Sequence, residues 1–260
     1  MTVFPLSVLN KTELSKRNSQ TAKDGLLNEE VIANKFHHWR LDMEAASWLQ
    51  EMSYRDEEVR DVSADVLSNK FKADILVNIY TKDKDAFKEY VSIKLVSNNK
   101  RGFNQIERGS CLKYKMLWNM PDSVYRSLRL FTGDVRPVSV QDLRDDRRMF
   151  LDEMPEQPRR EILGFFEENK FGILSDLLRG RDDNKADWFL VVMKPKSGDL
   201  SSKLVNIDDV VRLYLDGPVE VTKKGSLKIG KLVMQRKGGD RGKESANQLQ
   251  FKLDPLELFC

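Results

Sequence analysis

The chain has few side chains that bind transition metals or form disulfides. Its 260 residues include two cysteines and two histidines. Cys111 and Cys260 have no second cysteine or histidine nearby at metal-ligand spacing, so we expect neither structural zinc nor a disulfide framework. His37 and His38 are adjacent, and adjacent side chains on a helix point about 100° apart, so surface or packing roles are expected for them.

Long apolar runs are also missing. No uninterrupted run approaches the ~20 residues that a membrane-spanning helix needs. The first twenty residues lack the basic start, apolar middle and small-residue cleavage site of a secretory signal, so we expect a cytoplasmic protein. With 40% hydrophobic residues, the chain has enough apolar side chains for a sizeable core.

Charge is nearly balanced over the whole chain but not along it. The formal net charge of +3 is ordinary for a globular protein and does not indicate a polyanionic partner. Between Lys223 and Lys243, however, eight basic residues stand against one acid, Asp240. This segment is typical of a surface that binds phosphates, although composition alone fits a solvated basic loop equally well.

Hydrophobic periodicity predicts a mixed α/β protein. A helix is expected from Asn28, with Ile32, Phe36, Trp39 and Met43 on one face. Alternation predicts strands over 73–80 and 90–96, joined as a hairpin, and residues 110–180 are mostly helical in pattern, with breaks at Pro121, 132–137 and 155–158. After Asp187 the predicted strands are 188–194, 210–215, several within 219–237 with a turn at Gly225, and 249–253. Residues 1–20 are expected to form a loosely ordered arm and residues 21–260 a single domain.

A carboxylate and a lysine fall on the predicted hairpin. Asp74 lies near the start of its first strand, and Ser92 and Lys94 share one face of the second. Hydrolysis of a phosphodiester needs a divalent cation and a group that orients water, and magnesium prefers oxygen ligands. The pattern therefore predicts metal binding by Asp74 and the backbone carbonyl of Ile93, with Lys94 beside the water. The alternative is a solvated hairpin face, because a short D…SxK spacing is weakly specific.

Several segments resemble the HinP-type restriction endonucleases of the PD-(D/E)xK nuclease superfamily, which recognise GCGC. The resemblance runs in order from residue 21 almost to the C-terminus. It is carried by TAKDGLLNEEVIANKF (21–36), KLVSNNKRGFNQIE (94–107), FTG (131–133), RRMF (147–150), LLRGR (177–181) and QRKGGDRGKESANQLQFKLDPLELF (235–259).

The resemblance implies a mixed central β-sheet flanked by helices, with a C-terminal β-rich part that reads DNA. It implies magnesium-dependent cleavage of double-stranded DNA at GCGC, with Mn²⁺ expected to substitute. Asp74 and Lys94 match the family's active-site positions, and Glu29 is a candidate for an additional carboxylate near the metal. Ala73 stands where the relative has Ser, and Ser92 where it has Gln and the superfamily Glu, so Ser92 is expected to reach a metal only through water.

Two polar segments are candidates for DNA contacts. The first follows the catalytic strand directly, and the second combines glycines, cations and amides suited to phosphates and G·C base edges. A polar turn is the alternative for the first. The candidate residues are Lys100, Arg101, Asn104, Gln105, Arg236, Lys237, Asp240, Arg241, Lys243, Asn247 and Gln250.

Two other functions remain open at this point. One is an endonuclease of the same fold that requires or tolerates 5-methylcytosine, and the other is a DNA-binding protein that has lost catalysis, with Ser92 as the symptom. The expected partners of the main hypothesis are double-stranded DNA, a second copy of the chain on a palindromic site, and a methyltransferase that protects host DNA.

Overall fold

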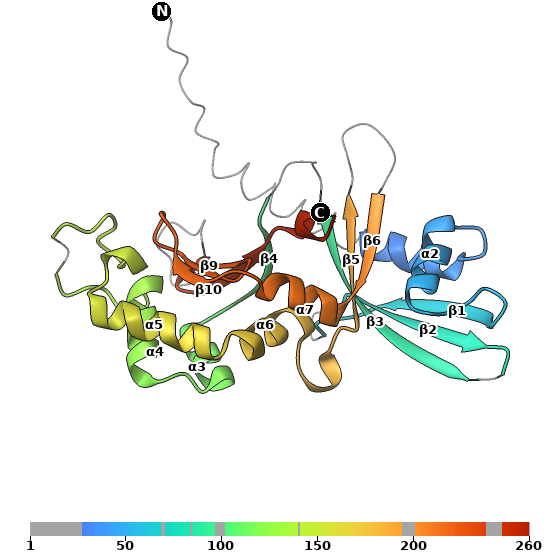
Figure 1. Cartoon of the computed structure of the whole chain (residues 1–260), viewed down its shortest axis with the longest axis horizontal. Helices are drawn as coiled ribbons and strands as arrows, with labels where there is room; N and C mark the ends of the chain where they lie inside the picture. Colours follow the sequence, from blue (N-terminus) through green and yellow to red (C-terminus); the bar gives the residue numbers. More distant parts are fainter. Residues whose placement is uncertain are drawn as a thin grey trace, which may run out of the picture.

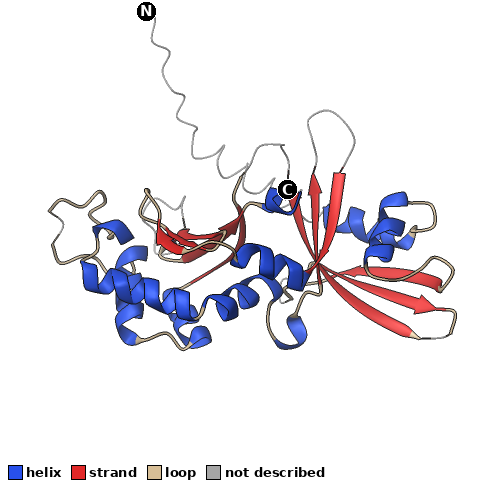
Figure 2. Ribbon diagram, viewed as in Figure 1, coloured by secondary structure: helices blue, strands red, loops and turns tan. Residues whose placement is uncertain are grey.

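The computed structural model describes residues 28–68, 71–83, 85–96, 102–139, 141–193, 201–237 and 246–259. Two five-stranded sheets organise these residues, with helices packed against both (Figure 1; Figure 2). None of the helices in this part of the chain is long and apolar enough to cross a membrane. The predicted arm over 1–20 lies outside the described residues, and one domain over 21–260 stays a prediction.

The first sheet is the mixed sheet that the sequence predicted. Strand β3 runs parallel to β5 and antiparallel to β2, and the predicted hairpin is confirmed as β2 and β3. Residues 28–37 form a helix, and its Phe36 packs with Val77 of β2 in one apolar core. The strands, in sheet order, are β1 (Val59–Val66), β2 (Ile75–Thr81), β3 (Ala86–Val96), β5 (Trp188–Met193) and β6 (Ser201–Asn206).

The second sheet is antiparallel throughout and has one buried face. Its Phe251 and Met234 are fully buried in a core that also contains Leu128 and Phe166 of the flanking helices. Gly225, with φ +71°, forms the predicted turn between β7 and β8. The strands, in sheet order, are β4 (Asn104–Gly109), β10 (Leu249–Leu253), β9 (Leu232–Arg236), β8 (Leu227–Ile229) and β7 (Val219–Val221).

The helical region predicted over 110–180 is confirmed. Its breaks fall at Pro121 and Pro155, each immediately before a helix. Pro158 lies within the first turn of α5 instead of breaking it, because a proline there displaces no intrahelical hydrogen bond. The helices are α3 (Cys111–Trp118), α4 (Asp122–Thr132), α5 (Glu156–Glu168) and α6 (Lys170–Arg179), and short 3-10 helices cover Leu151–Glu153, Asp182–Asn184 and Pro255–Phe259.

The strand predicted over 210–215 is wrong, because these residues lie in helix α7 (Ile207–Leu215). Their β-branched side chains favoured a strand, but the helix begins earlier. The side chain of Asn206 caps it by accepting from the backbone N–H of Asp208 at 2.9 Å. Ile207, Val210 and Tyr214 then fall at helical spacing and are buried on one face.

The first predicted helix ends earlier than expected. Met43 was assigned to its apolar face but is 89% exposed and begins a separate helix, α2 (Met43–Glu51). A turn over residues 38–41 separates the two helices, and Asp42, with an extended backbone, caps the second, because its carboxylate accepts from Glu44 N and Ala45 N. The sequence reasoning also missed β1 and β6, which form the two edges of the first sheet.

Helix α7 connects the two sheets. At its N-terminus, Ile207 N donates to the carbonyl of Asp187, immediately before β5. Near its C-terminus, the Tyr214 hydroxyl donates to the carbonyl of Asp254 at 2.7 Å, and the Tyr214 carbonyl accepts from Lys231 N at 2.9 Å. The relative position of the sheets, and hence of any site between them, depends on this helix.

Gly230 permits the close approach between α7 and the β8–β9 turn. Its φ is +57°, and an added Cβ would collide with the carbonyl oxygen of Tyr214. We expect Gly230→Ala to lower the free energy of unfolding by at least about 2 kcal/mol in a urea titration. Gly164 in α5 is the matched control, because an added Cβ meets no atom within 4 Å there and Ala should stabilise the helix by about 0.5–1 kcal/mol. Equal effects of the two substitutions would contradict this packing.

Candidate active site

A polar cleft of about 470 Å³ lies where the two sheets meet. Its walls come from the start of β2, from β3, from β4 of the second sheet, and from α3 and the end of α6. Four acidic and four basic side chains line it. Its charged side chains are Glu29, Lys72, Asp74, Lys94, Glu107, Lys113, Asp176 and Arg181.

Asp74, Ser92 and Lys94 converge in this cleft as predicted. Asp74 immediately precedes β2, and its N–H donates to the carbonyl of Val91 at 2.9 Å, which places its carboxylate beside β3. The Ser92 hydroxyl donates to Asp74 Oδ2 at 3.2 Å, and the Ile93 N–H donates to the same oxygen. Lys94 Nζ lies 3.8 Å from that oxygen and donates to the Ile93 carbonyl at 2.9 Å.

Ser92 lines the cleft and contacts Asp74. Its side chain is almost completely buried, with 1% exposure. A hydroxyl that donates to a carboxylate fixes the orientation of that carboxylate. The structure therefore gives Ser92 an orienting contact with Asp74, and the expectation that Ser92 reaches a metal only through water stays a prediction.

The oxygen atoms around Lys94 fit a hard divalent cation. The Lys94 ammonium contacts both Asp74 and the Ile93 carbonyl, the two groups predicted as metal ligands, so these oxygens already attract positive charge. Among the described residues no three His, Cys, Asp or Glu side chains cluster as a metal cage. Magnesium commonly uses one or two carboxylates and takes its other ligands from water and substrate phosphate, so this donor set suits it.

Glu29 faces the same cleft and is electrostatically coupled to Asp74. The pKa of Glu29 is raised from 4.5 to about 7, mainly by partial burial and also by the negative charge of Asp74, while Lys94 opposes the shift. A carboxyl whose pKa is raised by burial and by a neighbouring carboxylate in a cleft is typical of a functional site. Glu29, the predicted extra carboxylate, thus faces the same cleft as Asp74.

The sequence reasoning missed a second lysine in the cleft. Burial lowers the pKa of Lys72 to about 8, opposed by Glu107 and assisted by the positive charge of Lys94. Its ammonium lies 3.8 Å from Glu107, whose other oxygen accepts from Lys113 at 2.6 Å. Lys72 stands two positions before Asp74, and this spacing could have suggested that the two side chains share a face. Its contact with Glu107 could not be predicted in this way, because Glu107 lies on a strand of the other sheet.

The predicted DNA-binding residues fall into two described groups. On β4, Asn104 Nδ2 donates to the Leu95 carbonyl at 3.4 Å, and Gln105 is exposed and accepts from Gln250 of β10. The other group is Arg236, at the C-terminal end of β9, with Lys237 and Asn247. Lys100, Arg101, Asp240, Arg241 and Lys243 lie outside the described residues.

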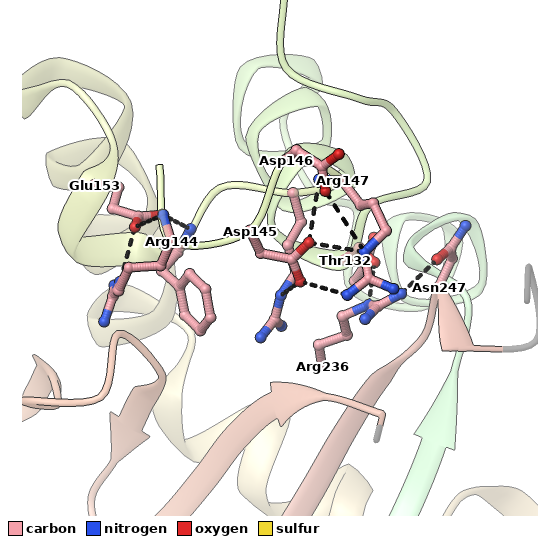
Figure 3. A network of polar contacts seen from close by, with 10 residues as sticks. Thr132, Arg144, Asp145, Asp146, Arg147, Glu153, Arg236 and Asn247 are labelled. Atoms are coloured by element: carbon pink, nitrogen blue, oxygen red, sulfur yellow. Dashed lines mark hydrogen bonds and ion pairs between the residues drawn. The ribbon is translucent and has the colours of Figure 1, made fainter. Parts of the chain in front are cut away.

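Arg236 belongs to a polar network between helix α4 and the end of β9 (Figure 3). Its guanidinium donates to the carbonyl of Thr132 at 2.7 Å and to Asn247 Oδ1 at 3.2 Å. The backbone N–H of its neighbour Lys237 donates to the carbonyl of Gln248. Arg236 and Asn247, both predicted to contact DNA, thus lie together and tie three distant segments to one another.

The network extends to the loop before α5. There Asp145 accepts from Arg147 at 2.8 Å, and this contact lowers the pKa of Asp145 to about 2 (Figure 3). Burial lowers the pKa of Arg148, and the positive charge of Arg236 contributes to the same shift. Segments 131–133, 147–150 and 235–237, which carry part of the family resemblance, therefore meet at one strongly charged position.

Comparisons with known proteins found a matching family and a similar fold. A family model described as the R.HinP1I restriction endonuclease matches residues 52–259. A solved structure of restriction endonuclease MspI in complex with its cognate DNA is similar in fold, with a TM-score of 0.60, 14% sequence identity and 87% of each chain covered. A comparison with curated proteins gave no match.

The raised pKa of Glu29 predicts a pH-dependent effect of Glu29→Gln on stability. The folded pKa lies above the unfolded value, so the protonated form stabilises the fold, and this stabilisation is lost as pH rises from about 4.5 through about 7. Without divalent metal, Glu29→Gln should therefore raise Tm at pH 8 and change it little at pH 5. Because Glu29 is only half-buried, we expect about 1 kcal/mol, or about 2–4 °C.

Glu30 provides the control for this measurement, because it is the exposed neighbour of Glu29 on the same helix. Glu30→Gln should change the difference between the two pH values much less, because the charge of Glu30 is the smallest of the causes that shift the pKa of Glu29. A rise in Tm of the same size at pH 5 and pH 8 for Glu29→Gln would show that ionisation of Glu29 in the cleft is not its cause.

Proposed function

The chain belongs to the R.HinP1I restriction endonuclease family and is thus a type II site-specific nuclease, and we propose that it cleaves double-stranded DNA at GCGC with magnesium as cofactor. The observation that carries the proposal is the convergence of Ser92, Ile93 and Lys94 on the Asp74 carboxylate within the cleft. The similar fold of an endonuclease solved with its cognate DNA supports a duplex substrate. GCGC specificity rests on the HinP-type resemblance.

Asp74 and the Ile93 carbonyl would hold the cation, with Glu29 as an additional carboxylate. Asp74 would use Oδ1, because its contacts with Ser92, Ile93 and Lys94 all use Oδ2. Magnesium, when bound, would neutralise developing charge on the scissile phosphate and acidify a bound water. Mn²⁺, which also prefers oxygen ligands, is expected to substitute.

Lys94 and Ser92 have different roles in this mechanism. The Lys94 ammonium has three N–H donors, of which one contacts the Ile93 carbonyl, so the others can orient the attacking water and stabilise charge on the phosphate oxygens. Ser92 would orient the Asp74 carboxylate through the hydrogen bond from its hydroxyl. The expected products carry a 5′-phosphate and a 3′-hydroxyl, as in the superfamily that the chain resembles.

Base and phosphate contacts are proposed for the two polar groups. Gln105 and Gln250 carry paired donors and acceptors suited to base edges, and Asn104 stands beside them. Arg236, Lys237 and Asn247 form the second group, next to the basic segment that contains Asp240, Arg241 and Lys243. Lys100 and Arg101 would neutralise phosphates near the cut. A palindromic site favours a two-fold dimer on DNA, and a methyltransferase would protect the host's own sites.

The first test is digestion of unmethylated phage DNA by the purified chain in magnesium, with the fragment ends sequenced. Lys94→Ala should lower the cleavage rate by at least about 100-fold, because it removes a donor that contacts the transition state. Binding to a GCGC duplex in a mobility-shift assay should change much less. Lys88→Ala is the control, because Lys88 lies on the same strand but is exposed.

Several outcomes would contradict the proposal. Discrete fragments that end elsewhere would reject GCGC while retaining the nuclease. Cleavage of methylated DNA alone would favour a 5-methylcytosine-dependent enzyme, and binding without cleavage in magnesium or manganese would favour an inactive DNA-binding protein. Equal activity of Lys94→Ala and Lys88→Ala would remove Lys94 from the active site.

A further inference from the structure

Three glutamine side chains form a hydrogen-bonded row across three neighbouring strands of the second sheet. Gln235 Nε2 of β9 donates to Gln250 Oε1 of β10 at 3.0 Å, and Gln250 Nε2 donates to Gln105 Oε1 of β4. Gln235 and Gln250 are directly opposite in the strand register and half-buried, while Gln105 is exposed. Gln235 is the member of this row that was not predicted to contact DNA.

An irregularity in β4 brings Gln105 into the row. Phe251 pairs with Glu107 and the next residue, Lys252, pairs with Gln105, so Ile106 is an extra residue in β4. Side chains alternate along a strand, so without this bulge Gln105 would lie on the face of buried Phe251. Bulges are common next to active sites, where they redirect a side chain.

The row lies beside the catalytic cleft. Ile106, the neighbour of Gln105, lines that cleft, and its carbonyl accepts from Lys72 Nζ at 3.5 Å. The same face of the sheet carries cations that suit a DNA backbone, because Arg108 is exposed opposite Gln250, and Lys252 is half-buried opposite Gln105. The exposed end of the row is therefore one residue along β4 from a position that lines the cleft.

The direction of the row decides what Gln105 offers to a ligand. An amide has an acceptor oxygen and a donor NH₂, so in a row each amide donates on one side and accepts on the other. In the observed direction Gln105 uses its oxygen for Gln250, and its NH₂ is the group left for a base acceptor such as guanine O6 or N7. In the reverse direction Gln105 would use its NH₂ and offer an oxygen, which suits a base amino group.

We propose that Gln235 sets the direction of this row and thereby determines whether Gln105 offers a donor or an acceptor to the base edge. Gln235 is then a positioning residue for sequence specificity, which acts through Gln250 without touching DNA itself. The proposal rests on the proposed function, because it concerns how the same enzyme reads its site.

Gln235→Glu tests the direction of the row. An ionised carboxylate only accepts, so Gln250 would have to donate to the introduced carboxylate and turn its own oxygen toward Gln105. Gln105 would then donate to Gln250 and offer its oxygen to the base. We expect the relative preference for GCGC over singly substituted sites to change by at least about tenfold, which is the effect of one wrong base contact.

The measurement is binding selection from a randomised duplex library, with every variant in a Lys94→Ala background so that DNA is not cut. Val233→Glu is the matched control, because it adds the same charge two residues earlier on β9, opposite Lys252. It should weaken binding to all sequences alike and leave the base preference unchanged. Thermal unfolding of each variant shows that the fold is retained, since loss of one hydrogen bond on this face costs only about 0.5–1.5 kcal/mol.

The outcomes separate the role of Gln235 from the proposed function itself. A changed base preference for Gln235→Glu, with only uniform weakening for Val233→Glu, supports the role of Gln235. An unchanged preference in both variants, while the Lys94→Ala parent selects GCGC, overturns that role and leaves the proposed function intact. If the parent selects no sequence and the wild-type chain cuts none, the proposed function fails and this inference fails with it.

Discussion

The candidate site depends on one carboxylate oxygen, Oδ2 of Asp74. A side-chain hydroxyl, a backbone N–H and a lysine ammonium approach it from three successive residues of β3. The antiparallel register of β2 and β3 makes this possible, because Ile75 pairs with Val91 and Asp74 therefore stands next to Ser92 and Ile93. With Oδ2 fixed in this way, the direction of Oδ1, the backbone carbonyl of Ile93 and the position of Lys94 all follow from the pairing of two strands.

An acidic pair and a basic pair of side chains surround this oxygen. Glu29 and Asp74 repel each other, and Lys72 and Lys94 do the same, and each pair shifts a pKa in the cleft. A divalent cation relieves the first repulsion and a phosphate relieves the second. Burial is the larger cause of both pKa shifts, and the ion pairs Lys94–Asp74 and Lys72–Glu107 offset part of the repulsion. The cleft thus holds acidic and basic groups side by side, which suits the cation and the phosphate of the proposed function.

Local patterns predicted much of this structure from the sequence. The alternation over 73–80 and 90–96 was sufficient for the β2–β3 hairpin and hence for the contact between Asp74 and Lys94. The strand predicted over 210–215 was wrong, because these residues lie in α7. The helix cap at Asn206 and the helical spacing of the buried apolar residues outweighed the β propensity of the β-branched residues. Contacts between separate segments of the chain left no local pattern. Lys72 meets Glu107, and Gln235 meets Gln250, only after strands that are distant in sequence have been placed side by side.

The bulge at Ile106 has a consequence for how such a chain tolerates changes of length during evolution. Ile106 is the extra residue of the bulge, so its deletion would restore regular pairing and leave Gln105 opposite Lys252, on the face that it already has. In β10, which pairs regularly with β9, deletion of one residue would instead exchange the faces of all positions on one side of it. Changes of length among relatives are thus expected at the bulge of β4 and not within β10.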